Sequence, residues 1–185
     1  LCAAARGFTF LNRQLMASQE RLGGQPLQER SAVIPNIMIP WAALGPRTAG
    51  PRPVFLHLGK FYGNRRPEPL VAAFALLLAR LPAAELHLAG KYSLAMVAPL
   101  LTTEALKHQV HLLGDHVDPL AAMRAADVLI CLDGPGREPV YLPSKLSEYL
   151  ASDRVVLCVT PPNSPTAEMV AGVPGSVLVA SHEPT

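Results

Sequence analysis

The sequence has few cysteines and little net charge, and each shortage excludes a class of protein. Only three cysteines occur among 185 residues, at Cys2, Cys131 and Cys158, and no two form a CxxC pair. An odd number of widely spaced cysteines does not build a disulfide framework, so we expect a reducing compartment. The two later cysteines lie in apolar runs and are expected to be buried free thiols. A net charge of +2 provides no electrostatic argument for a nucleic-acid partner.

Long apolar runs are also missing. Charged residues, glycine or proline interrupt every apolar stretch before it reaches the length of a membrane span. The first ten residues, LCAAARGFTF, include no initiating methionine and lack the pattern of a signal peptide. Half of the residues are hydrophobic and 16% are charged, which is typical of a chain that buries a core. We therefore expect a globular chain that is a piece of a longer protein.

Several motifs of cofactor and metal chemistry are absent. No GxGxxG follows a predicted strand, which argues against a dehydrogenase. Neither DxD nor HExxH occurs. His57 and His87 are expected inside strands, and neither has a second ligand at metal spacing. The other three histidines are close in sequence, but strand alternation and loop placement are expected to separate them: His108, His111 and His116. We therefore predict no metal site.

The first recognisable feature is a strand-helix-strand unit. The segment GFTFLN, Gly7 to Asn12, predicts a strand, and the following residues 13–24 predict a helix that stops at a Gly-Gly pair. The segment SAVIPNI, Ser31 to Ile37, predicts a second strand. Residues 38–53 are rich in proline and glycine and poor in charge, which indicates a linker.

From residue 53 onward, apolar strands alternate with helices. We expect strands at 53–59, 85–90, 109–114, 127–133, 154–160 and 176–181, and helices at 67–82, 93–107 with a break at Pro99, 118–126, 142–152 and 164–172. Near-continuous apolar strands separated by helices predict a parallel sheet with both faces covered. With right-handed crossovers, this is a doubly wound, Rossmann-like α/β domain, whose ligands bind beyond the carboxyl ends of the strands.

The loop after the first of these strands carries residues suited to a phosphate or diphosphate. Gly59 and Lys60 follow the strand, and Arg65 comes five residues after Lys60. Lysine acts as a point charge and arginine can bind phosphate bidentately, so the pair could form a clamp. The alternative is a solvated basic turn.

The segment LPSKLSEYLA, residues 142–151, predicts a short helix that starts at the same edge of the sheet. Free backbone N–H groups of Ser144, Lys145 and Leu146 would favour an anion there. Glu148 lies off the apolar stripe and could accept hydrogen bonds from two neighbouring hydroxyls, as on a ribose. The alternative is an ordinary amphipathic helix with an exposed glutamate near its start.

Together the two loops, LGKFYGNRRPEPL and PSKLSEYLA, resemble the C-terminal half of GT-B-fold glycosyltransferases of family four and its relatives, in the bacterial polysaccharide branch. The resemblance covers residues 8–170. It implies that Lys60 and Arg65 are the catalytic cations, which neutralise the donor diphosphate as the anomeric bond breaks. It also implies that the loop at Gly59 and the helix start at residues 144–146 hold this diphosphate, and that Glu148 holds the ribose.

The chain departs from the family's motif at one position, and the resemblance has one further implication, which concerns the donor base. The family's first motif glutamate falls at position 140, where this chain has Val140, and we assign Glu138 as a substitute near the donor sugar. The donor base of the family lies near residues 90–92 and 113–116. Tyr92 could stack on that base, and an ordinary turn is the alternative at each segment.

The resemblance implies that residues 1–37 end an N-terminal acceptor domain, 38–53 form the linker and 54–185 form the donor-binding domain. The substrate would be a UDP- or GDP-linked sugar, with no separate cofactor. Transfer would be retaining and independent of a metal ion, to a glycan or lipid-linked acceptor held by the missing N-terminal domain. The longer protein would be cytoplasmic or peripherally attached at the inner face of the membrane. These 185 residues alone are expected to bind nucleotide weakly and to transfer no sugar.

Two other functions remain open from the sequence. A GT-B-fold nucleotide-sugar epimerase would share the fold but would need catalytic carboxylates and a histidine in the cleft, and product analysis without an acceptor distinguishes it. A non-catalytic nucleotide-binding or assembly module would fit Val140. Absence of any nucleotide binding in the full-length parent would favour that module.

Overall fold

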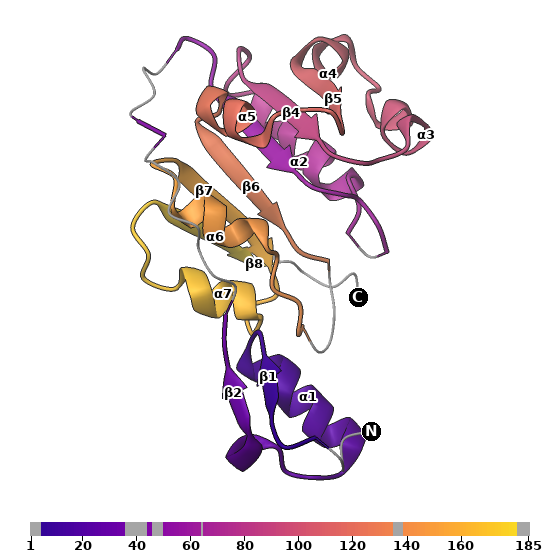
Figure 1. Cartoon of the computed structure of the whole chain (residues 1–185). Helices are drawn as coiled ribbons and strands as arrows, with labels where there is room; N and C mark the ends of the chain where they lie inside the picture. The colour runs from indigo at the N-terminus through magenta and orange to yellow at the C-terminus, as the bar shows by residue number, and fades with distance from the viewer. Residues whose placement is uncertain (1–4, 36–43, 46–49, 64, 135–138, 181–185) are drawn as a thin grey trace.

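A six-stranded parallel sheet forms the main body of the computed structural model, which describes residues 5–35, 44–45, 50–63, 65–134 and 139–180 (Figure 1). The strands are β3 (Val54–Leu58), β4 (Glu85–Ala89), β5 (Val110–Gly114), β6 (Val128–Leu132), β7 (Val155–Thr160) and β8 (Ser176–Ala180). Their order across the sheet is β5-β4-β3-β6-β7-β8, and every neighbouring pair is parallel. The doubly wound, Rossmann-like sheet is therefore confirmed, and each strand lies within its predicted range.

The helices of this part are short. They are α2 (Glu68–Leu78), α3 (Leu94–Val97), the 3₁₀ turn η2 (Ala98–Leu100), α4 (Glu104–Gln109), α5 (Pro119–Ala125), α6 (Lys145–Leu150) and α7 (Pro165–Val170). Of these, α2, α4, α5 and α7 begin beside a proline or a capping side chain. The helix expected at 93–107 is divided as predicted, because Pro99 lies inside the 3₁₀ turn and Thr103 caps a new helix. No helix among the described residues is long and apolar enough to cross a membrane.

Both faces of the sheet are packed, which explains why its strands are apolar throughout. Leu129 faces a core shared with Leu146 and Tyr149 of α6, whereas the next residue, Ile130, faces a second core shared with Phe74 of α2. Successive side chains of a strand point to opposite faces, so a strand covered on both sides needs apolar residues at adjacent positions. Cys131 and Cys158 are free and buried in the first core, as expected.

The N-terminal residues form a separate two-stranded parallel sheet of β1 (Phe8–Phe10) and β2 (Ser31–Val33), joined by α1 (Arg13–Gly23) and the 3₁₀ turn η1 (Gln28–Arg30). Oδ1 of Asn12 caps α1 by accepting a hydrogen bond from the backbone N–H of Leu15. Nδ2 of the same side chain donates to the Val140 carbonyl at 3.0 Å. Figure 1 shows this unit beside α7. Most of the predicted linker lies outside the described residues, and the proposed domain boundaries stay a prediction.

Gly90 holds the ends of β3 and β4 together at the edge where ligands are expected. Its φ is 129°, and a Cβ at this position would lie 2.0 Å from the carbonyl oxygen of Gly59. Only glycine combines that backbone conformation with such a close approach. The Gly59 amide donates to the Ala89 carbonyl at 2.8 Å, so the loop that carries Lys60 starts from a fixed position.

Candidate functional site

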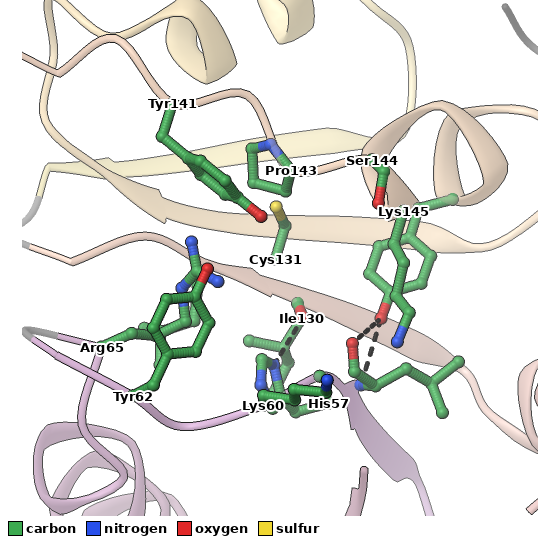
Figure 2. Close-up of a pocket in the computed structure, with 14 residues that line it drawn as sticks. His57, Lys60, Tyr62, Arg65, Ile130, Cys131, Tyr141, Pro143, Ser144 and Lys145 are labelled. Atoms are coloured by element: carbon green, nitrogen blue, oxygen red, sulfur yellow. Dashed lines mark hydrogen bonds between the residues drawn. The ribbon is translucent and has the colours of Figure 1, made fainter. Parts of the chain in front are cut away.

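A cavity of about 550 Å³ lies beyond the carboxyl ends of β3 and β6, where the strand order reverses (Figure 2). This is the position at which doubly wound sheets bind their ligands. The loop after β3, the end of β6 and the start of α6 supply its walls. The lining residues are His57, Leu58, Gly59, Lys60, Tyr62, Arg65, Ile130, Cys131, Leu132, Tyr141, Pro143, Ser144, Lys145 and Tyr149.

The structure brings together most of the residues singled out in the sequence. Those that line the cavity are Gly59, Lys60, Arg65, Ser144 and Lys145. They come from two segments that are far apart in the chain and that meet because β3 and β6 are neighbours in the sheet. The roles assigned to these residues stay predictions.

Three cationic side chains surround the cavity. Figure 2 shows the ammonium groups of Lys60 and Lys145 on one side of the cavity and the guanidinium group of Arg65 on the other. Burial lowers the pKa of Lys145 below its ordinary value, the charge of Lys60 adds to this effect, and Glu148 opposes it. Repulsion between like charges in a partly desolvated site is relieved by an anion, so the cavity is suited to phosphate groups.

Arg65 is held in place more firmly than a loop arginine usually is. Its Nη2 lies 3.3 Å from Oδ1 of Asp133, and both side chains are largely buried. The guanidinium carbon lies 5.2 Å from the ring centre of Tyr62 and 4.7 Å from that of Tyr141, which are cation–π distances. Arg65 therefore enters the cavity between two aromatic rings, with a carboxylate to orient it.

Asp133 belongs to a buried polar network that the sequence analysis did not identify. Its Oδ2 accepts hydrogen bonds from the hydroxyls of Thr160 at 2.8 Å and Thr166 at 2.6 Å. The Thr160 hydroxyl also lies 2.6 Å from that of Ser164, which caps α7. The available signal was an aspartate directly after a buried strand, but its partners come from β7, α7 and the loop after β3. Sequence spacing alone does not pair them.

The start of α6 differs from the prediction in two respects. The helix begins at Lys145 and has six residues, whereas the pattern predicted residues 142–152. The amide of Leu146 donates to the carbonyl of Pro143 at 3.1 Å, so the prediction of a free Leu146 N–H was wrong. The Leu146 side chain is fully buried in the core. Because so short a helix has a small macrodipole, the Lys145 side chain is the stronger anion-binding group at this wall.

Two other predicted residues, Glu148 and Tyr92, do not line the described cavity. Glu148 is half-buried on α6, one turn after Lys145. The hydroxyl of Tyr92 donates to the Leu88 carbonyl at 3.0 Å and accepts from the Gly114 amide at 3.1 Å, so it ties β4 to β5. Glu138 lies outside the described residues. The predicted contacts of Glu148 with a ribose and of Tyr92 with a base stay predictions.

His57 forms part of the cavity wall and is buried on β3, inside a strand as expected. Its Nδ1 lies 3.1 Å from the Ile130 carbonyl, and its ring stacks on Phe61 at 4.9 Å. Because a carbonyl only accepts, Nδ1 carries the proton and donates. Burial lowers the pKa of His57 to about 4, against the effect of this hydrogen bond, and the charges of Arg65 and Lys145 contribute to the lowering. The ring is therefore neutral near pH 7.

Comparison with known proteins supports this reading of the fold. The sequence profile of the family described as glycosyl transferases group 1 matches residues 52–185. No curated protein matches the chain significantly.

Among solved structures, WaaG, a glycosyltransferase involved in lipopolysaccharide biosynthesis, is similar with a TM-score of 0.72 at 17% identity, over 94% of this chain and 49% of WaaG. Anabaena HepE in complex with UDP-glucose is similar with a TM-score of 0.72 at 15% identity, over 97% of this chain and 51% of HepE. A Rickettsia africae glycosyltransferase has a TM-score of 0.68 at 16% identity, over 96% of this chain and 50% of its own. The chain thus spans about half the length of these proteins.

Proposed function

The chain belongs to the glycosyl transferases group 1 family, and we propose that it forms the part of a glycosyltransferase that binds a nucleotide-sugar donor. The observation that carries this proposal is the convergence of Lys60, Arg65 and Lys145 on one cavity at the reversal of strand order. Support also comes from HepE, whose solved structures hold UDP and UDP-glucose. A donor diphosphate is negatively charged and therefore complements the three cations of this cavity.

In this proposal the cations act on the diphosphate as it becomes the leaving group. Negative charge builds on the diphosphate when the bond to the sugar breaks, and fixed cations stabilise it without reorganising. Arg65 is oriented by Asp133 and two tyrosine rings, so little conformational freedom is lost when it binds phosphate. Lys60 and Lys145 then supply point charges from the opposite side.

The finer parts of the proposal concern the rest of the donor and the acceptor. Glu148 would hold the ribose and Tyr92 the base, while the backbone of Gly59 and Ser144 would contact the diphosphate. Transfer would be retaining and independent of a metal ion. The acceptor would be a glycan or a lipid-linked glycan, bound by the half of the protein that corresponds to the rest of WaaG and HepE. This chain alone would not complete the transfer.

Replacing Arg65 or Lys60 by alanine tests the diphosphate site. We expect either change to weaken UDP binding by about 1–3 kcal/mol, or about 5- to 150-fold, because each removes a charged hydrogen bond. Titration calorimetry with UDP and with GDP measures the loss and shows which base is preferred.

Arg66→Ala is the matched control, because Arg66 is exposed and pairs with Glu68 at 2.6 Å away from the cavity lining. It should leave UDP affinity unchanged. Uridine lacks the phosphates, so its affinity should be equal in all variants. If Lys60→Ala and Arg65→Ala bind UDP as tightly as the parent, the diphosphate assignment is wrong.

Lys145 gives the site a pH-dependent signature. Its pKa is lowered in the free protein, and a bound diphosphate should raise it again by stabilising the charged form. UDP binding at alkaline pH should therefore take up a fraction of a proton. Calorimetry at about pH 9 in two buffers of different ionisation enthalpy measures this uptake. The uptake should disappear in Lys145→Met, and equal uptake by parent and variant would exclude Lys145 as the responsive group.

A further inference from the structure

A second cluster of polar side chains lies on the sheet away from the cavity. Glu85 and His87 are on β4 and His111 is on the edge strand β5, at one end of the sheet order (Figure 1). Potential metal-ligating atoms of the three residues all lie within 4.8 Å of one another. The prediction that His87 has no second ligand at metal spacing was therefore wrong.

Sheet register explains why these residues meet. Residues 85 and 87 are two apart on one strand and share a face of the sheet. His87 is directly opposite His111 in the parallel pairing of β4 with β5. The two imidazole rings contact each other edge to face, with centres 4.9 Å apart. Two neighbouring strands thus present two imidazoles and one carboxylate on the same face.

The distances match those required by a small divalent cation. Oε2 of Glu85 lies 3.1 Å from Nε2 of His87 and 3.7 Å from Nε2 of His111. Zinc bonds of about 2.0–2.1 Å at tetrahedral angles place ligand atoms about 3.3 Å apart. The two separations from Glu85 are therefore within about 0.4 Å of this value, and all three ligand atoms lie within 4.8 Å of one another.

The surroundings of the cluster also favour a ligand. Nε2 of His111 is buried and has no hydrogen-bond partner among the described residues, although unpaired buried polar atoms are costly. Nη1 of Arg52 lies 3.2 Å from Oε1 of Glu85. The other carboxylate oxygen, Oε2, is the one directed at the imidazoles. The His111 side chain as a whole is 40% exposed, so the cluster lies close to solvent, which can supply water as a fourth ligand.

We propose that Glu85, His87 and His111 bind a zinc-class divalent cation that joins the edge strand β5 to β4. Two neutral imidazoles and a carboxylate are the donor set that zinc accepts in open sites. Each imidazole binds through Nε2 and keeps its proton on Nδ1, so the ion replaces the hydrogen bond from His87 to Glu85. The ion holds β5, which among the described residues has a sheet neighbour on one side only, and its binding stabilises the folded chain.

Calorimetry with zinc chloride, using the whole 185-residue chain, tests the site. We expect one zinc ion per chain and a higher melting temperature when zinc is present. Removing a residue that only hydrogen-bonds to a metal ligand weakens metal binding by about 10- to 100-fold. His111→Ala and Glu85→Gln each remove a ligand itself, so each should weaken zinc binding by at least this factor. His116→Ala, which changes a fully exposed histidine on a loop, should bind zinc like the parent.

Cobalt provides a readout in the parent that does not depend on how the variants fold. A cobalt ion bound by two imidazoles and a carboxylate gives visible bands without the near-ultraviolet charge-transfer band of thiolate ligands. Such a thiolate band would overturn the proposal, because it would assign binding to a cysteine. The proposal would also be overturned by no zinc binding up to about 1 mM, or by equal affinity in the parent, His111→Ala and Glu85→Gln.

Discussion

Replacing Asp133 by alanine is expected to lower the free energy of unfolding by about 3–5 kcal/mol, the cost of leaving a buried charge without its partner. Asp133 is 8% exposed, pairs with Arg65 at 3.3 Å and accepts from the hydroxyls of Thr160 and Thr166. Without the carboxylate, Arg65 remains largely buried beside a void and two hydroxyls lose their acceptor. The change should therefore destabilise the fold and disturb the cavity together.

Urea unfolding followed by circular dichroism measures this loss. Asp153→Ala is the matched control, because Asp153 is exposed in the loop before β7 and its removal should change stability by less than about 0.5 kcal/mol. Asp133→Asn keeps an acceptor for the threonine hydroxyls but loses the charge, so it should fold more stably than Asp133→Ala.

A double-mutant cycle separates the pairing with Arg65 from the rest of the network. If Asp133 positions Arg65, the stability losses of Asp133→Ala and Arg65→Ala should fall short of additivity by about 0.5–3 kcal/mol. UDP affinity should then fall in Asp133→Asn although its cavity cations are intact. Strict additivity together with unchanged UDP affinity would show that Asp133 has a structural role only.

Acidification is expected to destabilise the protein through His57 by about 3 kcal/mol between pH 6.5 and 4. The pKa of His57 is lowered to about 4 in the folded chain, because the ring is buried and two cations are near, whereas the unfolded chain has the ordinary value of 6.5. Between these values the unfolded chain binds more protons than the folded chain. Stability is therefore complete above pH 6.5 and falls as the pH decreases toward 4.

The variant His57→Asn isolates this contribution from other groups that titrate in the same range. Its amide can still donate to the Ile130 carbonyl but does not titrate. Unfolding free energies at several pH values from 7.5 to 4.5 should give a shallower slope for His57→Asn than for the parent. His108→Asn, at an exposed position on α4, should keep the slope of the parent. Equal slopes in the parent and His57→Asn would contradict the lowered pKa.

Local sequence patterns predicted a large part of the architecture. The run VLICL of β6 is apolar at every position because both faces of this strand are covered, and it was recognised as a buried parallel strand for that reason. Alternation of such strands with helices bounded by proline then led to the doubly wound sheet. Lys60 could be assigned to the ligand edge because it follows the carboxyl end of a strand, and Lys145 because it lies at the start of a helix.

Contacts between strands required the folded chain. Arg65 and Asp133 are 68 residues apart, and their ion pair depends on β3 and β6 being neighbours in the sheet. His87 and His111 meet only because the register of β4 and β5 places them opposite each other. Side-chain periodicity is a local property of each strand, whereas strand order and register result from packing helices on both faces at once. The elements and the charged edge could therefore be predicted from the chain, and the partners of each charge could not.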